Sequence, residues 1–325
     1  MEIPDLTLAE IEATRRAIDA YVVTTPVHHW RGMALERRVA PDTQVSLKLE
    51  LMQVTGTFKA RGALNVMLHL DDEQRRRGVT AVSAGNHAIA VAYGAQRLGL
   101  SAKVVMLATA NPVRVAAACA YGADVEIAAD GRAGFARAAE LEAEEGRIFV
   151  HPFEGRFTSL GAATVGWEWC RQVPGMDAVI VPIGGGGLMS GVASAVKTMS
   201  PTTRVYGVEP EGAAVMQRSF DAGEPMRWDE VRTIADSLAP PFTTPMAYTL
   251  CKRHVDGLVQ VSDAELTHAM RLLYDETKLV TEPAGAAATA ALCGPLRETL
   301  RGQRVGVLVC GSNIDIGTFH ALLGS

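Results

Sequence analysis

Short runs of apolar and β-branched residues recur along this chain, and longer alanine-rich segments with helical spacing separate them. The strand-like runs span residues 45–50, 102–107, 124–129, 147–152, 177–183, 204–210, 257–262 and 304–311. Two of the helix-length segments open on a capping box, in which Thr7 is followed by Glu10 and Ser262 by Glu265. Because helix-length segments regularly separate the strands, the pattern predicts parallel sheets with helices on both faces.

The length of 325 residues favours two lobes over a single core. We therefore expect an α/β protein with two lobes and doubly wound, mostly parallel open sheets. In such sheets ligands bind beyond the carboxyl ends of the strands, so the segments that follow strands are the places to search for chemistry. The proline-rich segment 231–250 reads as an irregular loop.

Charge and composition argue against several classes of function. The net charge is −5 with acidic and basic residues interleaved, which argues against nucleic acid and anionic membranes as partners. The five cysteines include no CxxC pair, which argues against a disulfide framework and against a zinc site. The acidic N-terminus lacks the pattern of a signal peptide, and no apolar run approaches the ~18 residues of a membrane span. We expect a soluble cytoplasmic protein.

A run of four glycines, Gly184 to Gly187, lies between the strand-like run 177–183 and a predicted helix. Glycine lets backbone N–H groups approach an anion closely at the positive end of a helix, so a phosphate is the expected guest. The run lacks the Gly-Lys-Ser/Thr ending of a nucleotide P-loop, and the dinucleotide fingerprint GxGxxG fails at Met189 or Ser190. The pattern predicts a phosphate cradle without nucleotide machinery, with a plain tight turn as the alternative.

Three further segments carry candidate chemistry. Lys59 lies in "VTGTFKARG" between Gly56 and Gly62, which we expect to let the backbone bend; alone, it would read as a solvated surface lysine. The segment "SAGNH", residues 83–87, opens a predicted helix and is either a carboxylate site or a set of caps with a packing histidine. Cys310 ends a strand-like run and could equally be a small buried hydrophobe.

Together these features describe one ligand. Pyridoxal phosphate offers a phosphate, an aldehyde that forms a Schiff base with lysine, and a ring nitrogen that needs a partner, and its amino-acid substrates bring a carboxylate. The combination predicts that Lys59 binds the aldehyde and that the glycine run holds the phosphate. Pyridoxal 5'-phosphate is therefore the expected cofactor, and an amino acid, a small-molecule partner, is the expected substrate.

The motifs "TFKARGA", "SAGNH", "GGGG" and "CGSN", in this order and spacing, resemble those of the fold-type II pyridoxal-phosphate enzymes of the tryptophan synthase beta-like superfamily, and within them the serine/threonine dehydratase family. The resemblance spans nearly the whole chain. It implies that Lys59 holds the cofactor with Phe58 beside it, that Asn86 bonds the ring hydroxyl, and that Cys310 faces the ring nitrogen. It further implies a phosphate site at Gly184, Gly185, Gly186 and Gly187, and a substrate carboxylate site at Ser83, Ala84, Asn86 and His87.

The resemblance also implies the domain organisation and the reaction. Residues 1–69 and 153–325 would form the large cofactor-binding domain, and residues 70–152 a small mobile domain that closes on it, with the cofactor between them. The reaction would be a β-elimination of water from a β-hydroxy amino acid such as L-threonine or L-serine, with Lys59 as catalytic base and a 2-oxo acid and ammonia as products. A homodimer is expected. No metal is expected, because Val215 stands where metal-activated relatives place an aspartate near Glu209.

Three departures from the family pattern leave the substrate open. Ala84 stands where serine racemase has its second acid–base serine, "LGAAT" at 160–164 replaces "AGQGT", and Ser237 replaces a glycine next to several prolines. Alternatives are a dehydratase or ammonia-lyase for 3-hydroxyaspartate or phenylserine, a racemase or β-replacement enzyme on the same fold, and a non-enzymatic binding protein. Racemisation is expected to be minor, because the Ala84 methyl group has no proton to give.

Overall fold

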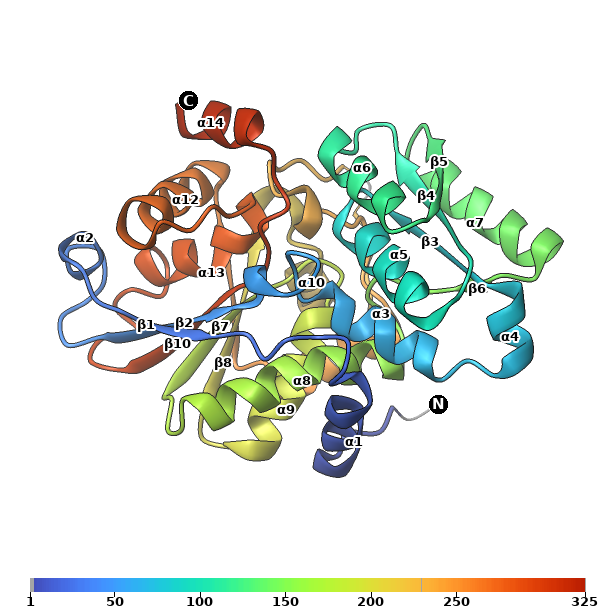
Figure 1. Cartoon of the computed structure of the whole chain (residues 1–325). Helices are drawn as coiled ribbons and strands as arrows, with labels where there is room; N and C mark the ends of the chain where they lie inside the picture. Colours follow the sequence, from blue (N-terminus) through green and yellow to red (C-terminus); the bar gives the residue numbers. More distant parts are fainter. Residues whose placement is uncertain (1–2, 229, 325) are drawn as a thin grey trace.

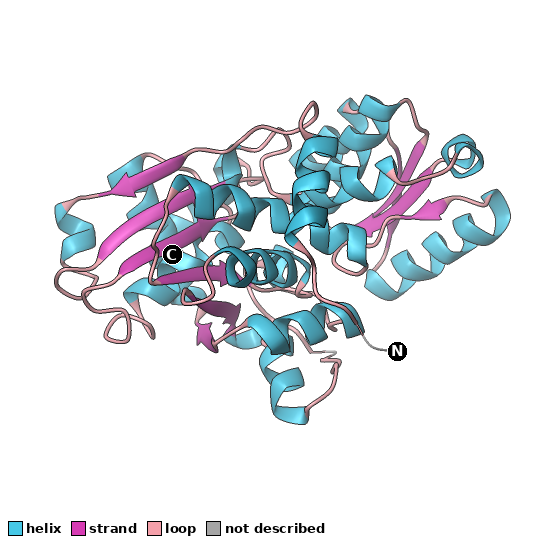
Figure 2. Ribbon diagram, turned by 90° about the horizontal axis from the view of Figure 1, so that it is seen from below, coloured by secondary structure: helices cyan, strands magenta, loops and turns pink. Residues whose placement is uncertain are grey.

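Two separate sheets organise the molecule, for which a computed structural model describes residues 3–228 and 230–324. The first has six strands in the order β1 (Val27–Trp30), β2 (Gln44–Leu49), β10 (Arg304–Val309), β7 (Ala178–Pro182), β8 (Arg204–Pro210) and β9 (Gly257–Val261). The second has four, in the order β5 (Asp124–Ala128), β4 (Ala102–Leu107), β3 (Val79–Ser83) and β6 (Ile148–Phe149). Figures 1 and 2 show the two sheets side by side, each with helices around it.

Both sheets are parallel apart from β1, which pairs antiparallel with β2 at the edge of the larger sheet. The predicted α/β class with two mostly parallel open sheets is therefore confirmed. Strands β4 and β8 cover the predicted runs 102–107 and 204–210 residue for residue. The strand predicted at 147–152 was too long. Strand β6 contains only two of these six residues, and both pair with β3.

Helices cover both faces of the larger sheet. Helices α8 (Arg156–Gln172) and α9 (Gly187–Met199) lie on one face, and α12 (Asp263–Thr277) and α13 (Pro283–Cys293) lie on the other (Figure 1). Helix α13 has the sequence "PAGAAATAALC", and its small apolar side chains are buried nearly all round. A helix that is apolar on every face belongs in a core, and α13 packs between β10 and α12.

The smaller sheet is covered in the same way. Helices α5 (Asn86–Leu98) and α6 (Pro112–Ala120) lie on one face and α7 (Gly131–Glu145) on the other (Figure 1). The remaining helices are α1 (Leu8–Ile18), α2 (Met33–Glu36), α4 (Asp72–Arg77), α10 (Val215–Ala222), α11 (Pro245–His254) and α14 (Ile316–Gly324). The predicted capping boxes at Thr7 and Ser262 are both present. Up to residue 244 the segment 231–250 is irregular apart from one 3-10 turn, η3 (Asp236–Leu238), and α11 follows.

Each sheet with its covering helices forms one half of the molecule. Helix α3 (Lys59–Leu68) lies between the two halves and packs on both α5 of the smaller half and α8 of the larger half (Figure 1). Its residue Arg61 is fully buried and pairs with Glu50 at 2.8 Å and with Glu168 at 2.7 Å. Buried charges are tolerated when they are paired in this way, so the network fixes where α3 begins. The domain boundaries at residues 70 and 152 stay a prediction. In the described ranges, no helix has the length and apolar character needed to cross a membrane.

Candidate functional site

A cavity of about 200 Å³ lies where the carboxyl ends of strands from both sheets face each other. Segments far apart in the chain line it, among them the ends of β3, β7 and β10 and the start of α3. The structure brings all the predicted site residues to this one cavity: Phe58, Lys59, Ser83, Ala84, Asn86, His87, Gly184, Gly185, Gly186, Gly187 and Cys310. Their individual roles stay predictions.

Lys59 is the first residue of α3 and extends its amine into the cavity. Its Nζ donates to the carbonyl oxygen of Pro152 over 2.6 Å and lies 5.3 Å from the ring centre of Phe58. Removal from water disfavours the charged amine, which lowers the pKa of Lys59 to about 8. A substantial fraction of this amine is therefore neutral near physiological pH, which is the form that attacks an aldehyde.

The two glycines that frame Lys59 have different functions. Gly56 has a φ of +74°, a left-handed turn conformation that favours glycine. Gly62 lies inside α3, so the expectation that it bends the backbone was wrong. A side chain at Gly62 would lie 3.2 Å from the carbonyl oxygen of Thr158, so this glycine allows α3 to pack closely on α8.

The glycine run connects β7 to α9 along one side of the cavity. Gly186 has a φ of +97°, and a side chain at Gly185 would collide with the ring of Phe153. A residue with a side chain would be strained at position 186 by the backbone conformation, and at position 185 it would clash with Phe153. The backbone N–H groups at the start of α9 therefore face the cavity at the positive end of the helix, which is a suitable site for a phosphate.

The segment "SAGNH" carries the chain from β3 into α5. Ser83 ends the strand, and its Oγ accepts a hydrogen bond from the backbone N–H of Gly85 at 2.9 Å. The side chain of His87 is buried, with Nε2 donating to the carbonyl oxygen of Val150 at 2.7 Å. Burial lowers the pKa of His87 to about 3, so the imidazole is neutral. A carboxylate would therefore bind the free backbone N–H groups of the first turn rather than this ring.

The amide of Asn86 is held by residues of the other sheet's loops. Its Nδ2 donates to Glu282 Oε1 at 2.7 Å and to Ser237 Oγ at 3.1 Å. Its Oδ1 accepts from Asn313 Nδ2 at 2.8 Å. These contacts fix the orientation of the amide, and they span sequence separations that no local motif could reveal.

Glu282 is a site residue that the sequence did not identify. It lies on the cavity, it is buried, and burial raises its pKa to about 7. Its partner Arg114 also escaped notice, since a single arginine in a predicted helix carries no distinguishing signal. In the sequence, Glu282 differs from other acidic residues only in its position directly before Pro283 and the alanine-rich helix α13.

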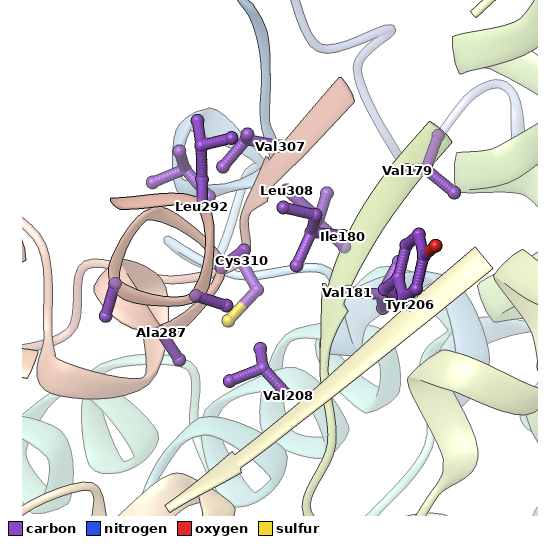
Figure 3. Close-up of a cluster of buried hydrophobic side chains, with 14 of the residues drawn as sticks. Val179, Ile180, Val181, Tyr206, Val208, Ala287, Leu292, Val307, Leu308 and Cys310 are labelled. Carbon is purple, nitrogen blue, oxygen red and sulfur yellow. The ribbon is translucent and has the colours of Figure 1, made fainter. Parts of the chain in front are cut away.

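Cys310 follows the last residue of β10 and is buried among apolar side chains, with Val208 and Ala287 nearby (Figure 3). Its thiol lies 3.4 Å from the carbonyl oxygen of Ala284. Burial, together with the nearby Glu282 carboxylate, raises the pKa of Cys310 far above its usual range, so the thiol is neutral. Cys310 therefore both packs in the core and lines the cavity.

An aromatic wall, formed by Phe135, Phe153 and Phe242, borders the cavity. The ring centres of Phe135 and Phe242 are 5.9 Å apart, and those of Phe153 and Phe242 are 5.4 Å apart. The three residues come from α7, from the segment after β6 and from the segment before α11. Sequence reasoning missed this wall, because the three phenylalanines lie in unrelated stretches of the chain.

Glu209 is the next-to-last residue of β8 and does not line the cavity. Its two carboxylate oxygens accept the backbone N–H groups of Met216 at 2.7 Å and Gln217 at 2.8 Å, at the start of α10. Residues 3–228 and 230–324 contain no group of three or more His, Cys, Asp or Glu side chains placed to hold a metal ion.

Comparison with known proteins gives consistent results. The pyridoxal-phosphate dependent enzyme family matches residues 18–311. Phenylserine dehydratase of Ralstonia pickettii is 54% identical over 322 residues, which cover 99% of this chain and 97% of the relative. The catabolic L-threonine dehydratase TdcB of Escherichia coli (strain K12) is 39% identical over 283 residues, which cover 86% of each chain.

Solved structures give the same result. Maize serine racemase superposes with a TM-score of 0.91 at 33% identity, over 98% of this chain and 97% of that chain. A threonine deaminase from Solanum lycopersicum, the processed form of isoform 2, superposes with a TM-score of 0.89 at 31% identity, over 99% of this chain and 95% of that chain. The likeness therefore extends over nearly the full length of the chain.

Proposed function

Because this chain belongs to the pyridoxal-phosphate dependent enzyme family, we propose that it removes water from a β-hydroxy-α-amino acid and releases a 2-oxo acid and ammonia. The observation that carries the proposal is Lys59, whose amine lies in a cavity next to a glycine run and has its pKa lowered to about 8. An amine of this kind can both bind an aldehyde and accept a proton from carbon.

The residues present fit pyridoxal phosphate. Lys59 would hold the aldehyde, the run from Gly184 to Gly187 would hold the phosphate, Asn86 would bond the ring hydroxyl, and Cys310 would face the ring nitrogen. The fit rests on the cradle at Gly185, where a side chain would collide with Phe153, and on the N-terminus of α9 behind it. When bound, the cofactor withdraws electrons from the substrate α-carbon.

The chain's own residues then perform three tasks. The free N–H groups at the start of α5, with Ser83 and Ala84 before them, bind the substrate carboxylate. Lys59 takes the α-proton as general base, which its lowered pKa permits near neutral pH. The small lobe, proposed to be mobile, closes over the cavity and keeps water away from the reacting atoms.

The names of the two curated relatives support the substrate class. One is a phenylserine dehydratase and the other a threonine dehydratase, and both of these substrates carry a hydroxyl on the β-carbon. A racemase is the second candidate, because maize serine racemase has the same fold. Elimination is favoured over racemisation because Ala84, which lines the cavity, offers no proton.

The test is a panel of serine, threonine, 3-hydroxyaspartate and phenylserine with detection of 2-oxo acids. We expect turnover of at least one, and borohydride reduction should fix the cofactor on Lys59, as read by mass spectrometry of peptides. Lys59→Ala is the matched control and should lose both signals. Absence of any oxo acid, or an adduct on another lysine, would contradict the proposal.

We also propose that the protein works as a cytoplasmic homodimer. The proposal rests on the family resemblance, because the exposed apolar residues Met33 and Ile316 are single residues and do not by themselves indicate an interface. Sedimentation velocity tests the oligomeric state, and a single monomer species at micromolar concentration would contradict it.

A further inference from the structure

Several residues that line the cavity are not assigned to the cofactor or to the substrate carboxylate. Lys59, Asn86, Cys310 and the glycine run are assigned to the cofactor, and the start of α5 to the substrate carboxylate. Much of the part that remains for the substrate side chain is apolar, although the polar residues Asp236, Ser237 and Glu282 also border it. Six of its apolar residues are Leu107, Phe135, Phe153, Leu238, Pro240 and Phe242. We name these six residues the side-chain subsite.

The charges around the subsite do not suit a polar or ionic side chain. Lys59 is the one cationic residue that lines the cavity in the described part of the chain, and the cofactor would occupy it. The two acids that line the cavity, Asp236 and Glu282, are both paired with Arg114. Arg227 lies over Phe242, with its Cζ 5.5 Å from the ring centre, but it does not line the cavity. A second carboxylate on the substrate, as in 3-hydroxyaspartate, would therefore meet two acids and no unassigned cation in the cavity lining.

The aromatic wall inside the subsite is incompletely covered. Phe135 and Phe242 are both half-buried, so each keeps ring surface free toward the cavity. Their ring planes are inclined at 58°, and those of Phe153 and Phe242 at 57°. Aromatic rings gain from tilted contacts at centre distances of about 4.5–7 Å, so a further ring would extend this cluster in its preferred geometry. A substrate with only a methyl group on the β-carbon, such as threonine, would leave these ring faces exposed to water.

The wall also joins the two halves of the molecule. Phe135 comes from α7, which covers the smaller sheet, whereas Phe242 precedes α11, which packs on α9 of the larger half. A substrate ring packed against both phenylalanines would bury apolar surface from both parts of the molecule at once. It would thereby favour the closed arrangement in which water is excluded.

We propose that the substrate carries an aryl group on the β-carbon and that Phe135 and Phe242 hold this ring in the side-chain subsite. The substrate class is then a β-aryl-β-hydroxy-α-amino acid, with 3-phenylserine as the simplest member. The inference rests on the proposed function and narrows it from β-hydroxy amino acids in general.

The first test measures binding without turnover. Phenylalanine and 2-aminobutyrate both lack the β-hydroxyl, so neither can eliminate water, and they differ mainly in the ring. We expect isothermal titration calorimetry of the holoenzyme to show phenylalanine binding about 10- to 100-fold more tightly. Equal or weaker binding of phenylalanine would overturn the inference, whatever the outcome of the turnover panel.

The second test asks which residues hold the ring. Phe135→Ala and Phe242→Ala should each lower kcat/KM for phenylserine about 10-fold or more while changing that for threonine much less. Phe157→Ala is the control, because Phe157 is 40% exposed, stacks on His69 and does not line the cavity. An unchanged ratio of the two kcat/KM values in both cavity variants would overturn the assignment.

The two proposals fail in different ways. If no β-hydroxy amino acid gives an oxo acid, the proposed reaction is wrong, and the calorimetric comparison still decides the aryl subsite. If serine or threonine is turned over with a higher kcat/KM than phenylserine, the reaction stands and the aryl inference is wrong.

Discussion

Arg114 of α6 donates from Nη2 to the buried carboxylate of Glu282 over 3.0 Å and so ties the smaller sheet to the loop before α13. The same guanidinium donates from Nε to the carbonyl oxygen of Asn313 at 2.7 Å and pairs with Asp236. Glu282 in turn holds the Asn86 amide. Arg114 is therefore linked to Asn86 through Glu282, which lines the cavity.

Replacement of Arg114 by methionine should destabilise the protein in a pH-dependent way. Removing one partner of a buried ion pair costs about 3–5 kcal/mol of unfolding free energy when the other stays charged. Burial already raises the pKa of Glu282 from its ordinary 4.5 to about 7, and loss of the cation raises it further. A raised carboxyl pKa contributes stability below 4.5 that is lost as the pH rises through the folded value. The deficit should therefore be larger at pH 8 than at pH 5.

Urea denaturation of Arg114→Met and wild type at the two pH values checks this. Arg114→Lys, which keeps a cation, is the matched control and should show a smaller deficit. A deficit that is the same at pH 5 and pH 8 would show that packing rather than charge explains the loss.

Covalent attachment of pyridoxal phosphate to the cofactor-free protein should follow the titration of Lys59. Only the neutral amine attacks an aldehyde, so the attachment rate should rise with pH around a midpoint of about 8. Stopped-flow absorbance after mixing gives the rate at each pH. Lys59→Ala should leave only a slow reaction of surface lysines, whose rate keeps rising toward their ordinary pKa of about 10.4. A wild-type midpoint above pH 9 would contradict the lowered pKa.

The parts of the site that follow from local backbone requirements could be predicted from the sequence. The glycine run between a strand and a helix, and a lysine in a glycine-framed turn, are local features, and the structure places both on one cavity. Arg114 and Glu282 could not be found in this way, because they lie 168 positions apart and meet only through the packing of the two halves.

Strand β1 was not predicted from the sequence, for a different reason. Its sequence "VHHW" places two exposed histidines in its centre, so it lacks the apolar alternation of a strand. Its pairing with β2 at the sheet edge, rather than its own pattern, makes it a strand. The phenylalanines of the aromatic wall likewise carried no periodic signal, and only the tertiary structure shows that they share a surface.

Racemisation should be a minor activity of the wild-type enzyme. Ala84 lines the cavity with a methyl group, which cannot return a proton to the α-carbon from the face opposite Lys59. Incubation of L-serine in deuterated water followed by chiral chromatography measures both exchange and D-serine. Ala84→Ser supplies a hydroxyl at this position and should raise D-serine formation. Rapid D-serine formation by the wild type would show that another group supplies the proton.

Removal of divalent cations should leave activity unchanged. Both carboxylate oxygens of Glu209 accept backbone N–H groups of α10, and Val215 beside them has no oxygen to offer a hard cation. Turnover after dialysis against a chelator, with and without added magnesium or calcium, checks this. Val215→Asp is an informative variant, because a gain in melting temperature on adding calcium would show that one carboxylate completes a site. Loss of wild-type activity that magnesium restores would contradict the prediction.

Cys310 should act at the cofactor as a neutral partner, and its substitutions separate this from a packing role. Its pKa is raised far above the usual range by burial, so the thiol can neither protonate the ring nitrogen nor hold it protonated as a carboxylate would. The electron sink is then weaker, which favours rapid loss of the β-hydroxyl over return of a proton to the α-carbon. Cys310→Ser offers another neutral group of similar reach and should keep most of the elimination rate.

Cys310→Asp should behave differently. The new carboxylate would hold a proton on the ring nitrogen and stabilise charge at the α-carbon, so a long-wavelength absorbance band should accumulate and elimination should slow by about 10²-fold. The melting temperature must be measured in parallel, because a carboxyl at a position only 3% exposed and close to Glu282 also costs stability. Cys293→Ser is the control for general effects of thiol loss, because Cys293 does not line the cavity. If Cys310→Asp folds, shows no new band and eliminates as fast as wild type, Cys310 only packs in the core.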